Sequence, residues 1–319
     1  MMRNWQEMQN QSFYEATARE RAINLVDAGT FHELAGPQDG FTSPHLPVLG
    51  EAVSFDDGTV AGVGKIGSRP VFVISQEGRF IGGAVGEVGG AKQVGIFKIA
   101  LEFYEKAIEK YPNDESRHPA IVYSFETGGV RLHESNAGLL AHAEVMEQIQ
   151  KCRGKIPVIS VVGSKVGCFG GMGFVSVATD MVIMSELGRI GLTGPEVIEQ
   201  EMGKKEFDST DRALIYRTTG GKHKYIMGDC AFLVRDTIGA FHSQIAEVLK
   251  MPYAKITSYR SIGDLDLVME QLDIIKISYE QKPSDSRDVW RYFGNQNAGQ
   301  IQDMNYDEFI GAVKTRRGV

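Results

Sequence analysis

The sequence has few cysteines, few prolines and no excess of positive charge. Its 319 residues include three cysteines, Cys152, Cys168 and Cys230, and no two of them are spaced as Cys-x-x-Cys. Three cysteines are too few for a disulfide framework or a four-cysteine zinc site, so the sequence predicts no metal site and favours a cytoplasmic location. The 34 Lys and Arg residues stand against 41 Asp and Glu, and the net charge of −7 argues against a surface for nucleic acid or anionic membrane.

Long hydrophobic runs are also scarce. Residues 1–21 are rich in Gln, Glu and Arg and contain no apolar core, which argues against a secretory signal. Only residues 156–184 are apolar for long enough to raise the question of a membrane span, and this run contains Lys165, Asp180 and five glycines. A buried strand, a glycine turn and a buried helix explain it better than a transmembrane helix.

Glycine, in contrast, is abundant. The 37 glycines make up about 12% of the chain, against roughly 7% in average proteins. The sequence has only 10 prolines and no Gly-X-Y period. The glycine excess therefore indicates tight turns or sites lined by backbone rather than disorder.

The glycines follow short apolar runs in a repeated order. The run at residues 120–125 is followed by a glycine turn at 126–131 and then by a helical pattern to about residue 152. A second run at 157–162 leads into a glycine-rich stretch at 163–173 and another helical pattern. Repeated strand, glycine turn and helix units predict an α/β fold with crossover connections. Further elements are expected around these units: a helix of two to four turns within 13–34 that is ended by Asp27-Ala28-Gly29, helices at 94–111 and 240–250 and from Pro195, a hairpin at 59–66 and 70–76, and strands at 181–184 and 189–192.

This pattern suggests three parts. Residues 1–35 are expected to form an N-terminal helical arm, and residues 36–250 the central α/β domain. Residues 251–319 are expected to form a C-terminal extension that packs on the domain or on a partner.

A strand, glycine turn and helix unit directs backbone N–H groups toward negative charge. Phosphate binding is one use of such a turn, but the glycine-rich passage at 82–87 lacks the Lys-Ser/Thr pair of a Walker motif. The other use is an oxyanion hole, in which the charge develops on a carbonyl oxygen during the reaction. Two such turns on neighbouring units can aim two amides at one oxygen.

Five glycine-rich or charged motifs occur in an order that resembles the β half of acyl-CoA carboxyltransferases, which have a crotonase-like fold, a spiral of ββα units. The resemblance covers about residues 16–234. The motifs are Ala18-Arg19-Glu20-Arg21 with Asp27-Ala28-Gly29-Thr30-Phe31, Gly82-Gly83-Ala84-Val85-Gly86-Glu87, Thr127-Gly128-Gly129-Val130-Arg131, Cys168-Phe169-Gly170-Gly171-Met172 and Thr193-Gly194-Pro195-Glu196.

Within that group, the amino-acid sequence of residues 126–138 and 170–174 resembles that of the β subunit of biotin-independent malonate decarboxylase. This resemblance implies an enzyme that decarboxylates a malonyl thioester on an acyl carrier protein to acetyl thioester and CO2, without biotin. It also implies the carrier's pantetheine-type arm as substrate carrier and a second crotonase-like (γ) subunit as partner. The alternative is the β subunit of a biotin-dependent acyl-CoA carboxyltransferase. A crotonase-type hydratase is disfavoured because Phe174 stands where a catalytic glutamate is expected, and a non-catalytic scaffold subunit would tolerate side chains at the turn glycines.

Loss of CO2 from a malonyl thioester places negative charge on the thioester oxygen, which backbone amides can stabilise. By resemblance, one amide is expected at Gly129 or Val130 and the other at Gly170 or Gly171. Three residues after the first turn, His133, Glu134 and Ser135, are candidates to donate a proton or to orient a water molecule, or they simply begin a helix.

Five other residues are weighed in the same way. A tight ion pair between Arg131 and the malonyl carboxylate would stabilise the ground state, so a scaffold role is expected for Arg131. Cys168 is expected to be a buried small residue rather than a nucleophile. Lys222, His223 and Lys224 form a basic cluster that either meets phosphates of the pantetheine-type arm or is a solvated turn.

Overall fold

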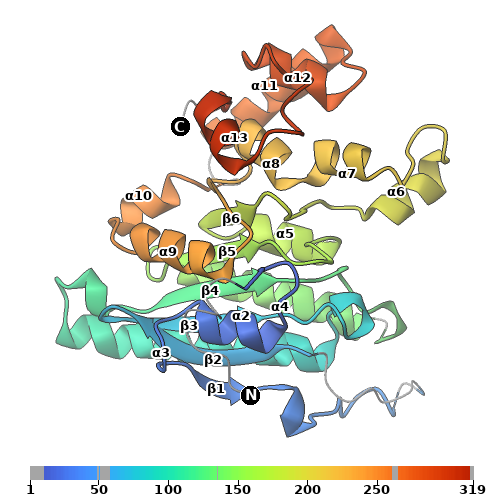
Figure 1. The fold of residues 1–319 in the computed structure, drawn as a ribbon. Helices are drawn as coiled ribbons and strands as arrows, with labels where there is room; N and C mark the ends of the chain where they lie inside the picture. The colour runs from blue at the N-terminus through green and yellow to red at the C-terminus, as the bar shows by residue number, and fades with distance from the viewer. Residues whose placement is uncertain (1–10, 49, 51–57, 135, 261–264, 317–319) are drawn as a thin grey trace.

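The computed structural model describes residues 11–48, 50, 58–134, 136–260 and 265–316 (Figure 1). Ser135, one of the candidates for proton donation, lies outside these residues. No helix among the described residues is both long and apolar enough to cross a lipid bilayer.

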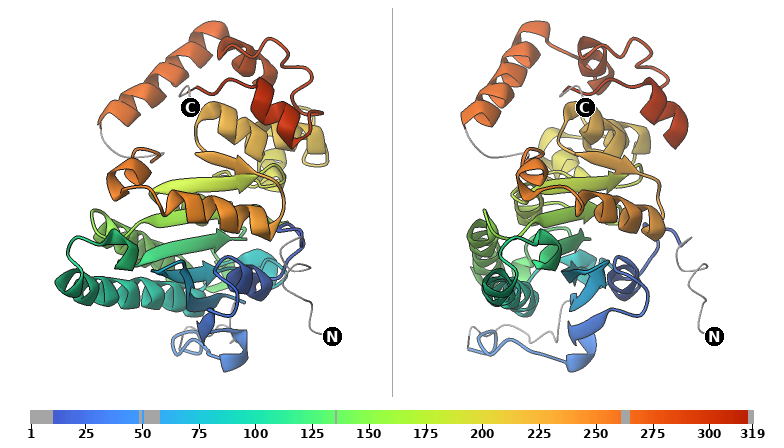
Figure 2. Two further views of the ribbon diagram at one scale, coloured as in Figure 1. Left: turned by 60° about the vertical axis from the view of Figure 1, so that its left-hand side comes forward. Right: turned by 90° about the vertical axis from the view of Figure 1, so that its left-hand side faces the viewer.

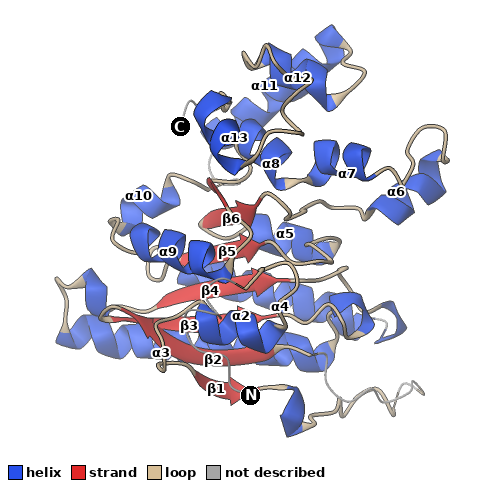
Figure 3. Ribbon diagram, viewed as in Figure 1, coloured by secondary structure: helices blue, strands red, loops and turns tan. Residues whose placement is uncertain are grey.

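A seven-stranded sheet runs through the molecule, and its strand order equals the chain order (Figures 1 and 3). The first three strands pair antiparallel, and each later strand pairs parallel to the one before it. The strands are β1 (His32–Ala35), β2 (Val60–Ile66), β3 (Arg69–Ser75), β4 (Ala120–Phe125), β5 (Val158–Val162), β6 (Met181–Ser185) and β7 (Phe232–Val234).

Helices connect the parallel strands and cover both faces of the sheet (Figure 3). They are α2 (Ala18–Asn24), α3 (Glu87–Lys110), α4 (Asn136–Cys152), α5 (Gly171–Val177), α6 (Pro195–Met202), α7 (Arg212–Thr219), α8 (Gly221–Met227), α9 (Ile238–Val248), α10 (Tyr253–Thr257), α11 (Leu265–Gln281), α12 (Ser286–Tyr292) and α13 (Tyr306–Ala312).

The alternation of side chains along the strands produces two separate cores. Phe72 and Ile74 of β3 belong to the core beneath α3 and α4, whereas Val71 and Val73 of the same strand pack with α2 and α9. Apolar residues occupy both faces of β4 and β5 as well, and every residue of these strands is buried. Continuous apolar runs such as 120–125 are the expected signature of strands covered on both sides.

Most of the predicted elements are confirmed, including the hairpin of β2 and β3, the strand at 120–125 and the helix that begins at Pro195. In the helix predicted within residues 13–34, the start at residue 13 is wrong, whereas the predicted stop at Asp27-Ala28-Gly29 lies close to the observed end. Helix α2 begins after the capping box of Thr17 and Glu20 and ends at Asn24, and Gly29, with φ of +72°, lies in the turn that leads into β1. The predicted strand at 189–192 is also wrong, since Arg189 and Ile190 form only isolated bridges.

The two ends of the chain differ in how they pack. Helix α2 contacts β2, β3, β4 and α9, so it belongs to the core rather than to a detached arm. The C-terminal helices gather at the end of the molecule opposite β1 (Figure 2). Trp290 and Phe309 are buried there, whereas α11 has no buried residue.

Candidate active site

The two predicted glycine turns follow neighbouring parallel strands. Phe125 at the end of β4 pairs in register with Val162 at the end of β5, so both turns leave the same edge of the sheet. Ligands of α/β proteins commonly bind at this edge, where parallel strands end. We call residues 126–131 the first turn and residues 163–171 the second turn.

The two turns are joined by hydrogen bonds. The N–H of Phe169 donates to the carbonyl of Thr127 over 2.9 Å, and the N–H of Thr127 donates to the carbonyl of Gly167 over 2.8 Å. On the other side of the first turn, the N–H of Val85 donates to the carbonyl of Gly129 over 2.8 Å. The first turn is thus hydrogen-bonded both to the glycine-rich passage at 82–87 and to the second turn.

These contacts use most of the amides in the two turns. Gly129 donates its N–H to Thr127 Oγ1 at 3.0 Å, and Gly170 donates its N–H to the carbonyl of Leu192 at 2.8 Å. Within the described part of the chain, the N–H groups of Val130 and Gly171 form no hydrogen bond. Both residues are half-buried. One oxyanion amide was expected at Gly129 or Val130 and the other at Gly170 or Gly171. The amides that remain available to a ligand are those of Val130 and Gly171.

Close contact between the turns requires glycine. Gly129 and Gly170 have φ of +113° and +63°, a region that favours glycine. A Cβ on Gly129 would lie 3.0 Å from the Cα of Gly170, and a Cβ on Gly170 would lie 2.9 Å from the carbonyl oxygen of Gly128. Any side chain at these positions would push the two turns apart.

An ion pair that includes Arg21 of the first motif joins α2 to the first turn. Arg21 of α2 is fully buried, and its Nη2 donates to Glu126 Oε2 over 2.6 Å. The other oxygen of Glu126 accepts from the N–H of Val166 in the second turn over 3.4 Å. Arg21 also donates to the carbonyls of Ala16 and Gln76. This pair ties the N-terminal helix to the base of the site.

Glu134 occupies a structural position. Its Oε1 accepts from Arg131 Nη1 at 2.8 Å, and its Oε2 accepts from the N–H of Glu87 at 2.7 Å, at the first turn of α3. Both side chains of the ion pair are buried. The position of Arg131 agrees with the expected scaffold role, because its guanidinium is held by Glu134 and by the carbonyl of Ala84. We therefore leave Glu134 out of the candidates for proton donation.

The substitution Glu134→Gln tests this assignment. An amide in place of the carboxylate removes the charge that pairs with Arg131 and turns one acceptor into a donor, so we expect a loss of about 3 kcal/mol in the free energy of unfolding. The kcat of the folded variant should stay within about threefold of wild type, well short of the factor of about 10²–10⁴ that a general acid supplies. Urea unfolding and steady-state kinetics measure the two effects, and a selective loss of kcat would restore Glu134 as proton donor.

Two histidines differ in their relation to the turns. His133, a predicted candidate, is exposed on the short helical segment after the first turn. His142 of α4, which the sequence analysis does not name, is buried and lies against Gly171: a Cβ on Gly171 would be 2.6 Å from His142 Cδ2. The sequence feature that could have pointed to His142 is its spacing from Gly138, which places both residues on one face of the helix that follows the first turn.

Cys168 is a buried packing residue, as expected. It is fully buried, burial raises the pKa of its thiol to about 12, and its Sγ lies 3.3 Å from the carbonyl of Met172. Cys152 and Cys230 are buried as well.

The cysteines should therefore resist alkylation. Burial also raises the pKa of the Cys152 thiol to about 12, so almost no thiolate is available near neutral pH. We expect iodoacetamide to modify none of the three cysteines in the native protein and all three in urea, as measured by intact mass. Alkylation of native Cys168 with parallel loss of activity would contradict this expectation and indicate a nucleophile.

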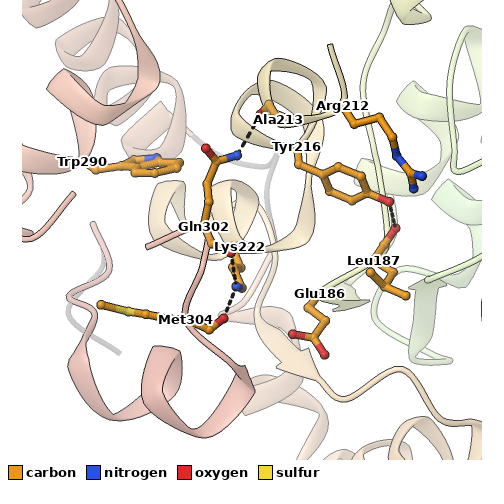
Figure 4. Close-up of a pocket in the computed structure, with 9 residues that line it drawn as sticks. All are labelled: Glu186, Leu187, Arg212, Ala213, Tyr216, Lys222, Trp290, Gln302 and Met304. Carbon is orange, nitrogen blue, oxygen red and sulfur yellow. Dashed lines mark hydrogen bonds between the residues drawn. The ribbon is translucent and has the colours of Figure 1, made fainter. Parts of the chain in front are cut away.

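The basic cluster at 222–224 is engaged by protein groups. Lys222 Nζ donates to the carbonyl of Gln302 at 3.0 Å, and Lys224 pairs with Asp229 at 3.1 Å. His223 accepts from Trp290 Nε1 at 3.1 Å, and burial lowers the pKa of its imidazole to about 3. A cavity of about 490 Å³ lies beside Lys222, between α7, α8 and the C-terminal segment (Figure 4). Since all three side chains have protein partners, we do not include them in the proposed site.

Exposed apolar side chains surround the turns. Leu132 is 84% exposed and Leu140 is 63% exposed, both just after the first turn. Phe174 of α5 and Leu192, whose carbonyl holds Gly170, are also more than half exposed. An apolar surface of this kind is typical of a region that another chain or a ligand covers.

Residues 12–289 match the family model described as the carboxyl transferase domain. The chain belongs to this family, whose members are enzymes, and the expected crotonase-like α/β fold of a carboxyltransferase is confirmed. The expected similarity to malonate decarboxylase is confirmed as well.

The similar proteins include one that matches over nearly its whole length. The chain is 59% identical to the malonyl-S-ACP:biotin-protein carboxyltransferase MADC of Malonomonas rubra, over 98% of this chain and 99% of that protein. It is 30% identical to the methylmalonyl-CoA carboxyltransferase 12S subunit of Propionibacterium freudenreichii subsp. shermanii, over 69% of this chain and 37% of that protein.

Among solved structures, a Pseudomonas malonate decarboxylase hetero-tetramer in complex with malonate matches with a TM-score of 0.66 and 35% identity. That match covers 78% of this chain and 87% of the other. The MdcD-MdcE hetero-dimer of Pseudomonas malonate decarboxylase matches with a TM-score of 0.60 and 32% identity, over 76% and 90% of the two chains.

Proposed function

We propose that this chain is a carboxyltransferase subunit that breaks the bond between the carboxyl group and the α-carbon of a malonyl thioester on an acyl carrier protein. The observation that carries the proposal is the pair of unused amides at Val130 and Gly171, on two turns that touch. As the carbon–carbon bond breaks, its electron pair moves toward the thioester oxygen. Two preorganised N–H groups stabilise that oxygen, and each contributes about 3 kcal/mol.

We further propose that the carboxyl group passes to a biotin-carrying protein. This fate was the alternative in the sequence analysis, and it is favoured by the 59% identity to a malonyl-S-ACP:biotin-protein carboxyltransferase over nearly the full length of both chains. The second candidate is release of free CO2 without biotin. It is supported by the resemblance of residues 126–138 to biotin-independent malonate decarboxylase and by the two Pseudomonas structures.

The proposal includes a second crotonase-like subunit that covers the turns. Leu132, Leu140 and Phe174 are exposed around the two free amides, and a partner that buries them would also exclude water from the developing enolate. The hetero-dimeric and hetero-tetrameric states of the Pseudomonas relatives support such a partner. The acyl carrier protein would deliver the thioester to this interface.

Product analysis tests the proposal. The purified chain with its partner subunit receives malonyl thioester, labelled in the free carboxyl group, on the carrier protein. One reaction contains a biotinylated acceptor protein, and the control contains the same acceptor without biotin. We expect acetyl thioester and label on the acceptor only when biotin is present. Release of labelled CO2 at the same rate in both reactions would identify the second candidate, and no acetyl thioester in either reaction would overturn both.

A further inference from the structure

His142 connects the two turns. Its Nδ1 lies 2.6 Å from the carbonyl oxygen of Gly138, one helical turn earlier in α4. Gly138 packs against the first turn, since a Cβ on it would lie 2.9 Å from Val130 Cγ1. On its other side the ring fills the space that a side chain on Gly171 would take, with Nε2 3.2 Å from that Cβ position. The imidazole therefore lies against Gly171 and is linked to Val130 through Gly138.

The hydrogen bond to Gly138 fixes the form of the ring. A carbonyl oxygen only accepts, so Nδ1 carries the hydrogen and Nε2 presents a lone pair. Burial lowers the pKa of His142, which keeps the ring neutral near pH 7. A ring of this form can take up one proton at Nε2, and the resulting imidazolium releases it readily.

The lone pair has no protein partner. His142 is 6% exposed, and its Nε2 is buried without a hydrogen bond among the described residues. A buried polar atom without a partner lowers the stability of the fold. Retention of this cost beside the two free amides indicates that the partner of Nε2 arrives with the substrates.

We infer that His142 transfers the proton that completes the reaction, a role that rests on the proposed function. When the carbon–carbon bond breaks, its electron pair moves onto the thioester oxygen, held by Val130 and Gly171. The CO2 unit bonds to the ureido nitrogen of the acceptor, and the N–H proton of that nitrogen passes to Nε2 of His142. As the electron pair returns from oxygen, the former α-carbon takes this proton from Nε2, which leaves acetyl thioester and a neutral His142.

Two reactions of the complete complex separate this role from a structural one. Cleavage of the carbon–carbon bond in malonyl thioester precedes both proton transfers, so this step needs the oxyanion site but no base, whereas exchange of the acetyl α-protons of acetyl thioester with D2O needs both. Mass spectrometry follows deuterium in the acetyl group, and single-turnover assays follow cleavage. We expect His142→Gln to slow exchange by a factor of about 10² or more and to slow cleavage by much less. His118→Gln is the matched control, because that histidine is also buried and bonded to a carbonyl, of Tyr111, and it should leave both rates unchanged.

The ratio of the two rates decides the outcome. Equal losses of exchange and cleavage in His142→Gln would overturn the inference and assign the ring to support of Gly171, and no loss in either would also overturn it. Wild-type complex that cleaves malonyl thioester but exchanges no acetyl protons would overturn it while the proposed function stands. Absence of wild-type cleavage is failure of the proposed function itself. If the glutamine variant does not fold, His142→Ala with added imidazole replaces it, and we expect imidazole to restore exchange.

Discussion

The variant Gly170→Ala should lose a factor of about 10²–10³ in kcat, the effect of removing one oxyanion donor. Its Cβ would lie 2.9 Å from the carbonyl oxygen of Gly128 and from the Cα of Gly129, and neither backbone atom can rotate away. The turns must then separate, which would misalign the two amides, of Gly171 and Val130, that are proposed to hold one oxygen. Steady-state kinetics of the complex with malonyl thioester measures the loss, and thermal unfolding verifies that the variant folds.

Gly154→Ala is the matched control. Gly154 has φ of +79°, similar to the +63° of Gly170, but a Cβ at this position would meet no atom within 4 Å. Both variants therefore place a side chain on a backbone with positive φ, and only Gly170→Ala disturbs the turns. A folded Gly170→Ala variant with the kcat of Gly154→Ala would show that the turns do not hold the transition state.

The largest effect on stability is expected for Arg21→Met. The substitution leaves the carboxylate of Glu126 buried without its cation and removes the donors to the carbonyls of Ala16 and Gln76. Loss of one partner from a buried ion pair costs about 3–5 kcal/mol. Urea unfolding should show this decrease in the free energy of unfolding, and much of it should be recovered when Glu126→Gln is added.

Arg19→Met provides the comparison for that measurement. Arg19 pairs with Glu33 at 2.7 Å, but both side chains are about a third exposed, so water replaces the lost contact. Exposed pairs of this kind contribute about 0–1 kcal/mol. If Arg21→Met costs no more than Arg19→Met, the buried pair is not what holds α2 to the base of the site.

The parallel strands and the two turns could be predicted because their signals are local. An apolar run such as 120–125 followed by two glycines defines a buried strand and its turn without knowledge of the rest of the chain. The helix within 13–34 was predicted to start too early because Phe13 and Ala16 are apolar like its buried face. The capping box of Thr17 and Glu20 sets the observed start.

The site was predicted only to the level of the two turns. Which amide in each pair is free depends on partners distant in sequence, since Leu192 takes the N–H of Gly170. Glu134 was a candidate because carboxylates often transfer protons, but its contacts with Arg131 and the N-terminus of α3 are visible only in three dimensions. His142 was not predicted for the same reason, because no sequence pattern shows that α4 packs against Gly171.

The agreement between strand order and chain order bears on how the protein is made. Each strand after β1 pairs with its immediate predecessor, so the sheet can grow at one edge while the chain leaves the ribosome, with no strand waiting for a distant partner. The two glycine turns meet once residue 171 has emerged, about halfway through synthesis. The C-terminal helices, which follow β7, join a sheet and a site that are already complete.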